Sequence, residues 1–295
     1  MIMSKGRKVY QVCINIIMIL VTLCMILPLL LLFMSSITDE STLIVNGYSF
    51  FPAKFSLGAY AYIMQNASTI FRAYGITIVV TVVGTTLSLL LASLTAFPLS
   101  LRALPGRRVL SFIVFFTMLF SGGLVPSYIM WTTVFNIRNT IFAYIFPNFL
   151  LGAFNIILLR TFFTTSIPVD IYEAAEIDGA TYMRIYWQIV LPLGKPILVT
   201  VGLFTGLTYW NDWTNGLYYI NKSDMLSIQA LLNRMIQDIQ ALLANSTANS
   251  GALMQIPQVS IRMAIAFVAI MPILIVYPFL QKYFASGIML GAVKG

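Results

Sequence analysis

The sequence predicts an all-α membrane protein with about six transmembrane helices. Of its 295 residues, 59% are apolar and only 9% are charged, whereas soluble domains carry about 25% charged residues. Six apolar runs are each long enough to cross a bilayer, which needs about 20 residues as a helix. Because no stretch has the mixed polar pattern of a soluble domain, we expect residues 1–295 to form a single transmembrane domain.

Composition also limits the chemistry that this chain can perform. Histidine, the commonest metal ligand and general base, is absent from the sequence. The two cysteines, Cys13 and Cys24, lie inside the first apolar run, where a thiol behaves as a small hydrophobe. The net charge of +8 comes from basic residues that flank apolar runs, in clusters of no more than three. Such clusters orient helices in a membrane, so we expect no metal site and no nucleic-acid partner.

The first two runs predict two long helices joined by a turn-rich loop. Residues 9–38 are uncharged and follow a basic cluster. A signal peptide also begins with a basic cluster, but this run is too long for one and no clear A-x-A site follows, so we favour a membrane span. Residues 73–101 carry Gly84, Ser88 and Ala92, small residues that let membrane helices pack closely.

The third run, residues 109–137, is interrupted by the Ser-Gly-Gly segment 121–123 and by Pro126. A break within a span is tolerated only where protein or a water-filled cavity satisfies the freed backbone groups. Alternatively, the helix ends near Phe120 and an outer loop follows it. Both interpretations are consistent with the residues.

The remaining runs complete the predicted six. They are residues 139–159, 191–213 and 262–283. A polar loop of about residues 161–192 separates the fourth run from the fifth, and a longer one of about residues 214–261 separates the fifth from the sixth.

Basic residues predict the orientation. With six spans both termini share one side of the membrane, and eleven of the seventeen basic residues then fall on that side, together with the loop 161–192. Positive charge collects in cytoplasmic loops. We therefore expect a multi-pass protein of the plasma membrane with both termini and the loop 161–192 in the cytoplasm, and with the loop 214–261 outside the cell.

The cytoplasmic loop contains an acidic segment, residues 166–192. Pro168 suits the first turn of a helix, and Asp178 with Gly179 provides a break before a second short helix. The apolar residues of the first helix are expected on its inner side and the acidic ones on its outer side. The inner set is Ile171, Ala174, Ala175 and Ile177, and the acidic set is Asp170, Glu173, Glu176 and Asp178. This pattern predicts a docking surface.

The same segment resembles the EAA motif of permease subunits of ABC importers. Every position of the motif is matched at the expected spacing, by Glu173, Ala174, Ala175, Gly179, Ile189, Leu191 and Pro192. The resemblance implies the type I importer permease fold. It also implies that the first short helix is the coupling helix, which sits in a cleft of the ATPase and receives its movement. Asp178 belongs to the same coupling loop.

The residue types suit that role. Ala174 and Ala175 permit a close approach, Glu173 can accept charge-assisted hydrogen bonds from a basic partner, and Gly179 permits a turn that a side chain would hinder. Three aromatic residues of the second helix either pack it under the bundle or anchor it at headgroup depth. They are Tyr182, Tyr186 and Trp187.

Further segments resemble the carbohydrate class of these permeases, the MalG-like subunits, and in particular the branch for complex oligosaccharides in Gram-positive bacteria. They are residues 120–126, 139–140, 147, 166–168, 177–180, 210–211 and 291–295. The resemblance covers nearly the whole chain. It implies a MalF-like second permease subunit, two cytoplasmic ATPase subunits that hold ATP and Mg, and an extracellular, lipid-anchored solute-binding protein. In related permeases the C-terminal tail reaches between the ATPase subunits, so Lys294 and Gly295 either do the same or form a solvated tail.

Sugars are held by aromatic faces beside hydrogen-bonding side chains, and a path across a bilayer needs polar groups that face inward. The end of the fifth run offers this mixture in Tyr209, Trp210, Asn211 and Asp212. Trp210 is alternatively an aromatic belt residue. Weaker candidates are Tyr128, Trp131 and Asn155.

The sequence bears on three other functions: an enzyme, a permease for a non-sugar solute and an ion-coupled transporter. No segment matches the Walker A pattern GxxxxGK[ST], so we expect a transport subunit without its own ATPase site or cofactor, and not an enzyme. The EAA motif is shared by importers of many solutes, so an ABC permease for a non-sugar solute is the main alternative. An ion-coupled secondary transporter is disfavoured because the runs lack buried carboxylates and histidines.

Overall fold

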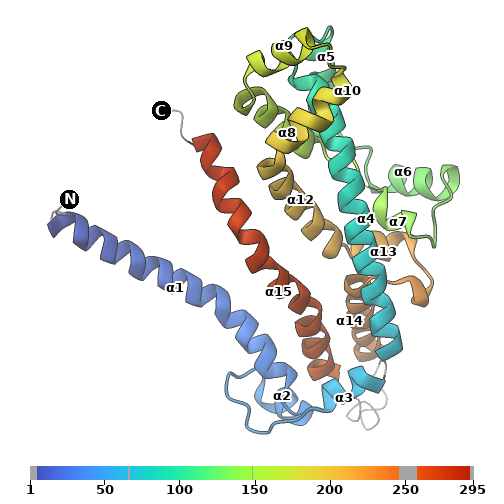
Figure 1. Ribbon diagram of the computed structural model, residues 1–295. Helices are drawn as coiled ribbons and strands as arrows, with labels where there is room; N and C mark the ends of the chain where they lie inside the picture. The colour runs from blue at the N-terminus through green and yellow to red at the C-terminus, as the bar shows by residue number, and fades with distance from the viewer. Residues whose placement is uncertain (1–4, 66, 148, 246–257, 293–295) are drawn as a thin grey trace. The chain divides into compact units, whose positions relative to one another are not determined.

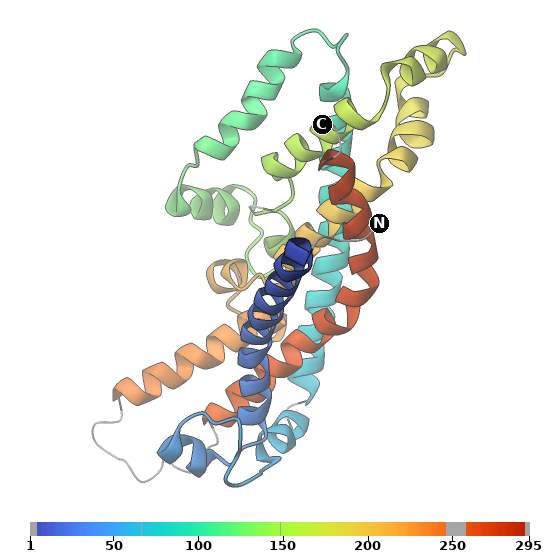
Figure 2. The ribbon, with the colours of Figure 1, turned by 90° about the vertical axis from the view of Figure 1, so that its left-hand side faces the viewer.

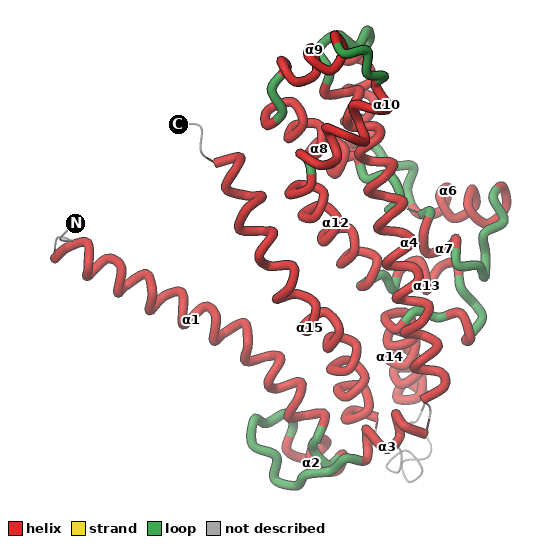
Figure 3. The backbone as a smooth tube through the Cα atoms, viewed as in Figure 1, coloured by secondary structure: helices red, strands yellow, loops and turns green. Residues whose placement is uncertain are grey.

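The computed structural model describes residues 5–65, 67–147, 149–245 and 258–292, and the regular elements in these ranges are all helices (Figures 1 and 3). The chain folds as two compact units. One is built from residues 1–68 and 234–272, and the other from residues 69–233 and 273–295.

The first unit holds helix α1 (Lys5–Ser36), two short helices, α2 (Glu40–Asn46) and α3 (Gly58–Gln65), and the start of α15 (Gln258–Ala292). Glu40 organises it. Its carboxylate accepts hydrogen bonds from the backbone N–H groups of Val259 and Ser260, both at 2.8 Å, and from the Ser260 hydroxyl at 2.7 Å. The first N–H groups of a helix lack partners within the helix. Glu40 therefore caps α15.

The second unit is organised around α4 (Ala67–Ser100). Its buried residues recur at helical spacing and include the small residues Gly84, Ser88 and Ala92. The position of Gly84 shows why size matters, because a Cβ there would lie 2.6 Å from the ring of Tyr209. The predicted close packing along the second run is confirmed.

Helices after α4 complete the second unit. They are α5 (Arg107–Leu119), α6 (Leu124–Ile129), α7 (Phe142–Ile145), α8 (Ala153–Ser166), α9 (Val169–Ile177), α10 (Tyr182–Ile185), α11 (Leu191–Leu193), α12 (Lys195–Trp210), α13 (Thr214–Tyr219) and the beginning of α14 (Ile228–Asn245). One π-helical turn follows α6 (Met130–Val134), another follows α10 (Tyr186–Val190), and a 3-10 turn (Ser223–Met225) precedes α14.

Among the described residues, three helices are long and apolar enough to cross a membrane by themselves, at residues 10–36, 67–100 and 259–276. Three bent pairs raise the number to six if each pair is one span. The pairs are α5 with the segment 124–134, bent by 108°, α8 with α9, bent by 79°, and the segment 182–193 with α12, also bent by 79°. The predicted number of six spans is therefore reached only when bent pairs are counted, and two of these pairs include segments of the predicted cytoplasmic loop, α9 and residues 182–193.

Besides the fifth run, which bends at Gly194, the third and fourth predicted runs are not continuous helices. The third stops at Leu119, as the alternative interpretation expected, but a short helix rather than a loop follows (Figure 2). Gly123, with a φ of 85°, breaks the path there. The fourth run divides into α7 and α8. The residues between them include Pro147 and Gly152, which disfavour a continuous helix.

Two apolar clusters of described residues lie in the core of the second unit. One joins the C-terminal part of α4 to α8, α9, α10 and α12, and contains Phe97, Phe163 and Tyr186. The other joins the middle of α4 to α7 and α13, and contains Tyr144 and Tyr209. The first cluster lies directly under the acidic segment.

Candidate functional site: the coupling loop

The acidic segment forms two short helices with a turn between them, as its sequence predicted. Pro168 is the residue before α9 rather than a residue of its first turn. Asp178 and Gly179 end the helix. The Gly179 N–H donates to the Glu176 carbonyl at 3.0 Å, and the Ala180 N–H to the Ala175 carbonyl at 2.9 Å. These two bonds, with Gly179 at a φ of 75°, form a Schellman motif.

The inner face of α9 differs from the predicted one. Tyr172 is buried, and its ring lies 6.3 Å from that of Phe97 in α4. Ala175 packs against the same cluster, whereas Ala174 is exposed and Ile177 is 86% exposed. Residues 172 and 175 lie three apart and so share one face of the helix, and the long Tyr172 side chain reaches the core that Ile177 was expected to reach. Burial raises the pKa of the Tyr172 hydroxyl, which therefore stays neutral.

The face of α9 that turns away from Tyr172 is exposed. Glu173, Ala174 and Ile177 are all exposed. An isoleucine that is 86% exposed at the end of a helix, next to an acid and a small residue, forms a surface that suits contact with another protein.

The part of the acidic segment that follows α10 packs on α4 through one aromatic residue, Tyr186. Tyr186 is 1% exposed, and its hydroxyl forms a 2.7 Å hydrogen bond with the Ser93 hydroxyl. Its ring also lies 5.8 Å from that of Phe97. Tyr182 and Trp187 are instead 58% and 53% exposed. Packing under the bundle is thus the role of Tyr186 alone among the three aromatic residues.

The last motif positions lead into the joint with α12. Ile189 and Leu191 are half-buried against the apolar cluster, and Pro192 is exposed. The joint itself requires Gly194, because a Cβ there would lie 2.8 Å from both the Phe163 ring and the Val190 carbonyl oxygen. Close contact between this joint and α8 therefore depends on a glycine.

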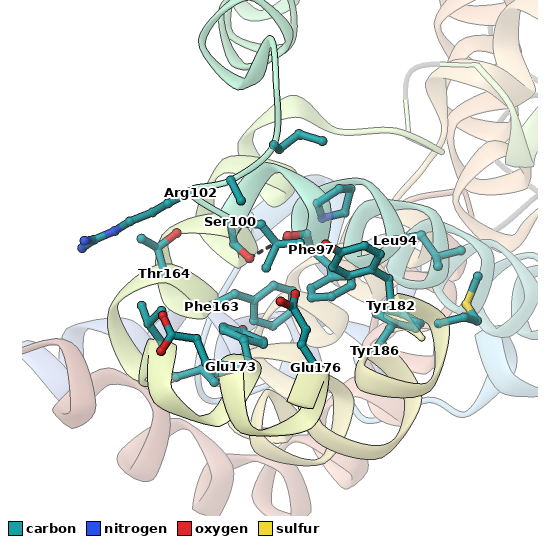
Figure 4. Close-up of a pocket in the computed structure, with 18 of the residues that line it drawn as sticks. Leu94, Phe97, Ser100, Arg102, Phe163, Thr164, Glu173, Glu176, Tyr182 and Tyr186 are labelled. Atoms are coloured by element: carbon teal, nitrogen blue, oxygen red, sulfur yellow. Dashed lines mark hydrogen bonds between the residues drawn. The ribbon is translucent and has the colours of Figure 1, made fainter. Parts of the chain in front are cut away.

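A pocket of about 730 Å³ lies between α9, α10, α8 and the end of α4 (Figure 4). Glu173 and Glu176 border it from α9, and Ser100 and Arg102 border it from the end of α4 and the loop that follows. Its remaining lining is mostly apolar. The acidic residues thus flank a hollow beneath the coupling loop.

The predicted substrate-path residues fall into different environments. Tyr209 is 2% exposed and donates its hydroxyl to the Ile145 carbonyl at 3.0 Å, so its visible role is packing. Trp210 is also buried. Asn211 is exposed, and with Asp212 it borders a hollow of about 440 Å³ that includes Phe204 and Trp213.

Asp212 is held by its own loop. It is 4% exposed, and its Oδ1 atom accepts hydrogen bonds from the Thr214 hydroxyl at 2.9 Å and the Asn215 N–H at 3.1 Å. Its Oδ2 atom is buried and has no hydrogen-bond partner in the part of the chain that the structure describes. Burial raises the pKa of this carboxyl group, although the Asn215 and Thr214 donors partly oppose that shift.

The weaker candidates do not gather around that hollow. Tyr128 stacks on Tyr219 with ring centroids 5.8 Å apart, and Trp131 lies 4.9 Å from Phe135. Asn155 of α8 donates to the Thr205 hydroxyl of α12 at 3.1 Å. The substrate-path role of all these residues stays a prediction. Lys294 and Gly295 lie outside the described residues.

Sequence reasoning missed three residues that hold the coupling loop in place. Tyr172, Ser93 and Gly194 each sit in apolar surroundings, where their contacts depend on segments distant in the sequence. The alternation of acidic and apolar residues in α9 indicated a two-faced helix. It did not indicate which apolar residue reaches α4.

Comparison with known proteins identifies the family. Residues 84–289 match the family described as binding-protein-dependent transport system inner membrane component. The chain is 37% identical to Protein LplC of Bacillus subtilis, over 99% of this chain and 97% of the relative. It is also 37% identical to the polygalacturonan/rhamnogalacturonan transport system permease protein YtcP of the same organism, over 94% and 96%.

A solved structure shares the fold. A chain of a bacterial ABC transporter involved in the import of the acidic polysaccharide alginate superposes with a TM-score of 0.78, at 29% identity, over 96% of this chain and 99% of that one. The fold is therefore that of an ABC importer permease, a membrane transport subunit. The chain belongs to the family of binding-protein-dependent transport system inner membrane components.

Proposed function

We propose that this protein is a permease subunit of an ATP-driven ABC importer and that, with a MalF-like second permease subunit, it forms the path for an oligosaccharide. Two cytoplasmic ATPase subunits hydrolyse ATP with Mg, and an extracellular, lipid-anchored binding protein delivers the sugar. Both chain termini lie in the cytoplasm. Family membership and the intact EAA segment support this assembly.

One face of α9 is exposed, and the opposite face is packed on α4. This arrangement supports the proposal. The outer face of α9 offers Glu173, Ala174 and Ile177 to a partner. Its inner residue Tyr172 packs on Phe97 of α4. A partner that pushes on the outer face thus moves a helix whose other face is fixed to the longest helix of the unit. We infer that this helix transmits closure of the ATPase to the membrane helices.

The remainder of the coupling loop supports α9. Asp178 and Gly179 end it in a Schellman motif, and the arm that includes Ile189, Leu191 and Pro192 continues into α12. Lys294 and Gly295 are proposed as a further contact with the ATPase, in keeping with the resemblance of the terminal residues.

An oligosaccharide is proposed as the cargo because of the relatives. The name of YtcP refers to polygalacturonan and rhamnogalacturonan, and that of the solved importer refers to the acidic polysaccharide alginate. The arabinooligosaccharides transport system permease protein AraQ of Halalkalibacterium halodurans is 26% identical over 92% of this chain. Asn211 is the candidate that best fits contact with a sugar, because it is exposed beside the 440 Å³ hollow and carries an amide group. Tyr209, Trp210 and Asp212 instead shape the wall.

Site-specific cross-linking tests the partner of α9. In the assembled importer, Ile177→p-benzoylphenylalanine should form a photo-product with the mass of this chain plus one ATPase subunit. The same substitution at Leu217, which is 39% exposed on α13, is the control and should give no such product. A cross-link from position 217 but not from position 177 would refute the docking assignment.

The cargo is tested separately with the purified binding protein and the reconstituted importer. Acidic oligogalacturonides, neutral arabino-oligosaccharides and a dipeptide are each added, and stimulation of ATP hydrolysis is measured. Stimulation by either oligosaccharide supports the proposal. Stimulation by the dipeptide alone would identify a permease for a non-sugar solute.

A further inference from the structure

Four arginine side chains line one cavity of about 710 Å³ at the junction of α4, α5 and α8. Arg102 comes from the loop after α4, Arg107 and Arg108 from the first turn of α5, and Arg160 from α8. The excess of basic residues on one side of a membrane explains why each is present. It does not explain why four of them meet around one cavity.

Two of the guanidinium groups are held by a single backbone oxygen. Arg107 Nε donates to the Leu99 carbonyl at 2.8 Å, and Arg160 Nε donates to the same oxygen at 3.1 Å. Leu99 lies in the last turn of α4, where carbonyl groups carry partial negative charge. Each guanidinium has five N–H donors, so one shared carbonyl satisfies only a small part of their capacity.

The cavity lacks a negative side chain. Its described lining consists of Arg102, Leu104, Gly106, Arg107, Arg108, Ser111 and Arg160, none of which is acidic. The first turn of α5 contains no acidic residue, and the residue before it, Gly106, has no side chain to cap the helix. Arg107 and Arg108 therefore occupy the positive end of a helix dipole, where cations are disfavoured. An anion in the cavity would offset both effects.

A second observation points to a ligand. Ser111 lies one turn beyond Arg108 on α5 and lines the same cavity. Its hydroxyl oxygen is buried and has no hydrogen-bond partner among the residues that the structure describes. A buried hydroxyl without a partner costs free energy. A phosphate oxygen would supply the missing acceptor.

We propose that this cavity binds the phosphate group of an anionic phospholipid, in the leaflet that contains the α4–α5 loop. The surface of α5 supports a lipid rather than a soluble anion. Every residue of α5 is at least partly exposed, Ser111 included although its hydroxyl oxygen is buried, and the side chains of Phe112 and Ile113 are 60% and 52% exposed. A lipid phosphate at the first turn of α5 would let the acyl chains lie along this apolar helix. Basic pockets between membrane helices are known to hold such headgroups.

The test uses the assembled importer in detergent, titrated with phosphatidylglycerol or phosphatidylcholine and examined by native mass spectrometry. The pocket variant R102Q/R108Q changes the two exposed arginines of the cavity. The control variant R184Q makes the same change outside the cavity. Arg184 is exposed and donates a hydrogen bond to the Gln188 side chain. Since a basic residue near an anionic surface contributes about 1 kcal/mol, the pocket variant should bind phosphatidylglycerol about 30-fold more weakly, and R184Q should bind it as the unmodified protein does.

Two further measurements complete the test, one on a lysine variant and one with inorganic phosphate as competitor. R102K/R108K keeps the charges and should restore most of the phosphatidylglycerol binding. Inorganic phosphate at millimolar concentration should displace little of the lipid, because it cannot use the apolar surface of α5. Equal retention of phosphatidylglycerol by R102Q/R108Q and R184Q would overturn the site. Tight binding of inorganic phosphate that displaces the lipid would overturn the assignment to a phospholipid.

Discussion

The hydroxyl group of Tyr186 lies 2.7 Å from the hydroxyl group of Ser93, and this hydrogen bond fixes the second half of the coupling loop to α4. The two residues are 93 positions apart, and both are buried. The same helix also receives Tyr172 of α9 through Phe97. Two separate parts of the coupling loop are therefore attached to one long helix, so displacement of the loop acts on α4.

The hydrogen bond between Tyr186 and Ser93 should contribute measurably to stability. Tyr186→Phe removes one buried hydroxyl while Ser93 keeps its 3.1 Å bond to the Leu90 carbonyl. We expect a loss of about 1 kcal/mol, the usual net value of a buried hydrogen bond. Thermal unfolding of the purified permease measures the change, and Tyr182→Phe at an exposed tyrosine is the control, for which we expect no shift. Additive effects in the double variant Tyr186→Phe with Ser93→Ala would show that the bond contributes nothing.

The effect of a substitution at Gly179 should depend on the backbone conformation and not on the space available for the new side chain. Nothing lies within 4 Å of a Cβ built there, but its φ of 75° is in the left-handed region. Gly179→Ala should destabilise the coupling loop by about 1–2 kcal/mol. Gly179→Asn should cost less, because asparagine enters this region more readily. Hydrogen exchange of the amides of α9 provides the measurement, and equal protection in the Ala and Asn variants would contradict the strain argument.

The buried carboxyl group of Asp212 should make stability depend on pH. Its pKa is raised in the folded protein because the charged form is buried. The folded state therefore holds its proton more tightly than the unfolded state, so stability falls as the pH rises from about 4 through the raised pKa. Asp212→Asn keeps an acceptor oxygen for Thr214 and Asn215 but cannot ionise. The melting temperature of this variant relative to the unmodified protein should increase over that interval. A constant difference across the interval would show that Asp212 ionises normally.

Much of the fold follows from local features of the sequence. The lengths of the apolar runs predicted the long helices α1, α4 and α15, and the pairing of Asp178 with Gly179 predicted the break after α9. These features succeed because hydrophobic length and glycine conformation are properties of short segments.

Other features depend on distant contacts. Tyr172 rather than Ile177 packs on Phe97, which lies about 75 positions before Tyr172 in the chain. The 79° joint at Gly194 lies against the ring of Phe163, which leaves no space for a side chain there. The sequence spacing within α9 is compatible with either face. The four arginines that line the cavity beside α5 were interpreted individually as flanking charges, because their convergence arises from the packing of α5 against α8.

The most direct test of the coupling role measures sugar uptake per ATP hydrolysed in the importer reconstituted in liposomes. Glu173→Lys reverses a charge on the exposed face of α9, and Asp224→Lys reverses one at an exposed position in the loop before α14. Because charge-assisted contacts with a basic partner would become repulsive, uptake per ATP should fall about tenfold in Glu173→Lys. It should be unchanged in Asp224→Lys. Normal uptake per ATP in Glu173→Lys would contradict the role of α9 as the coupling helix.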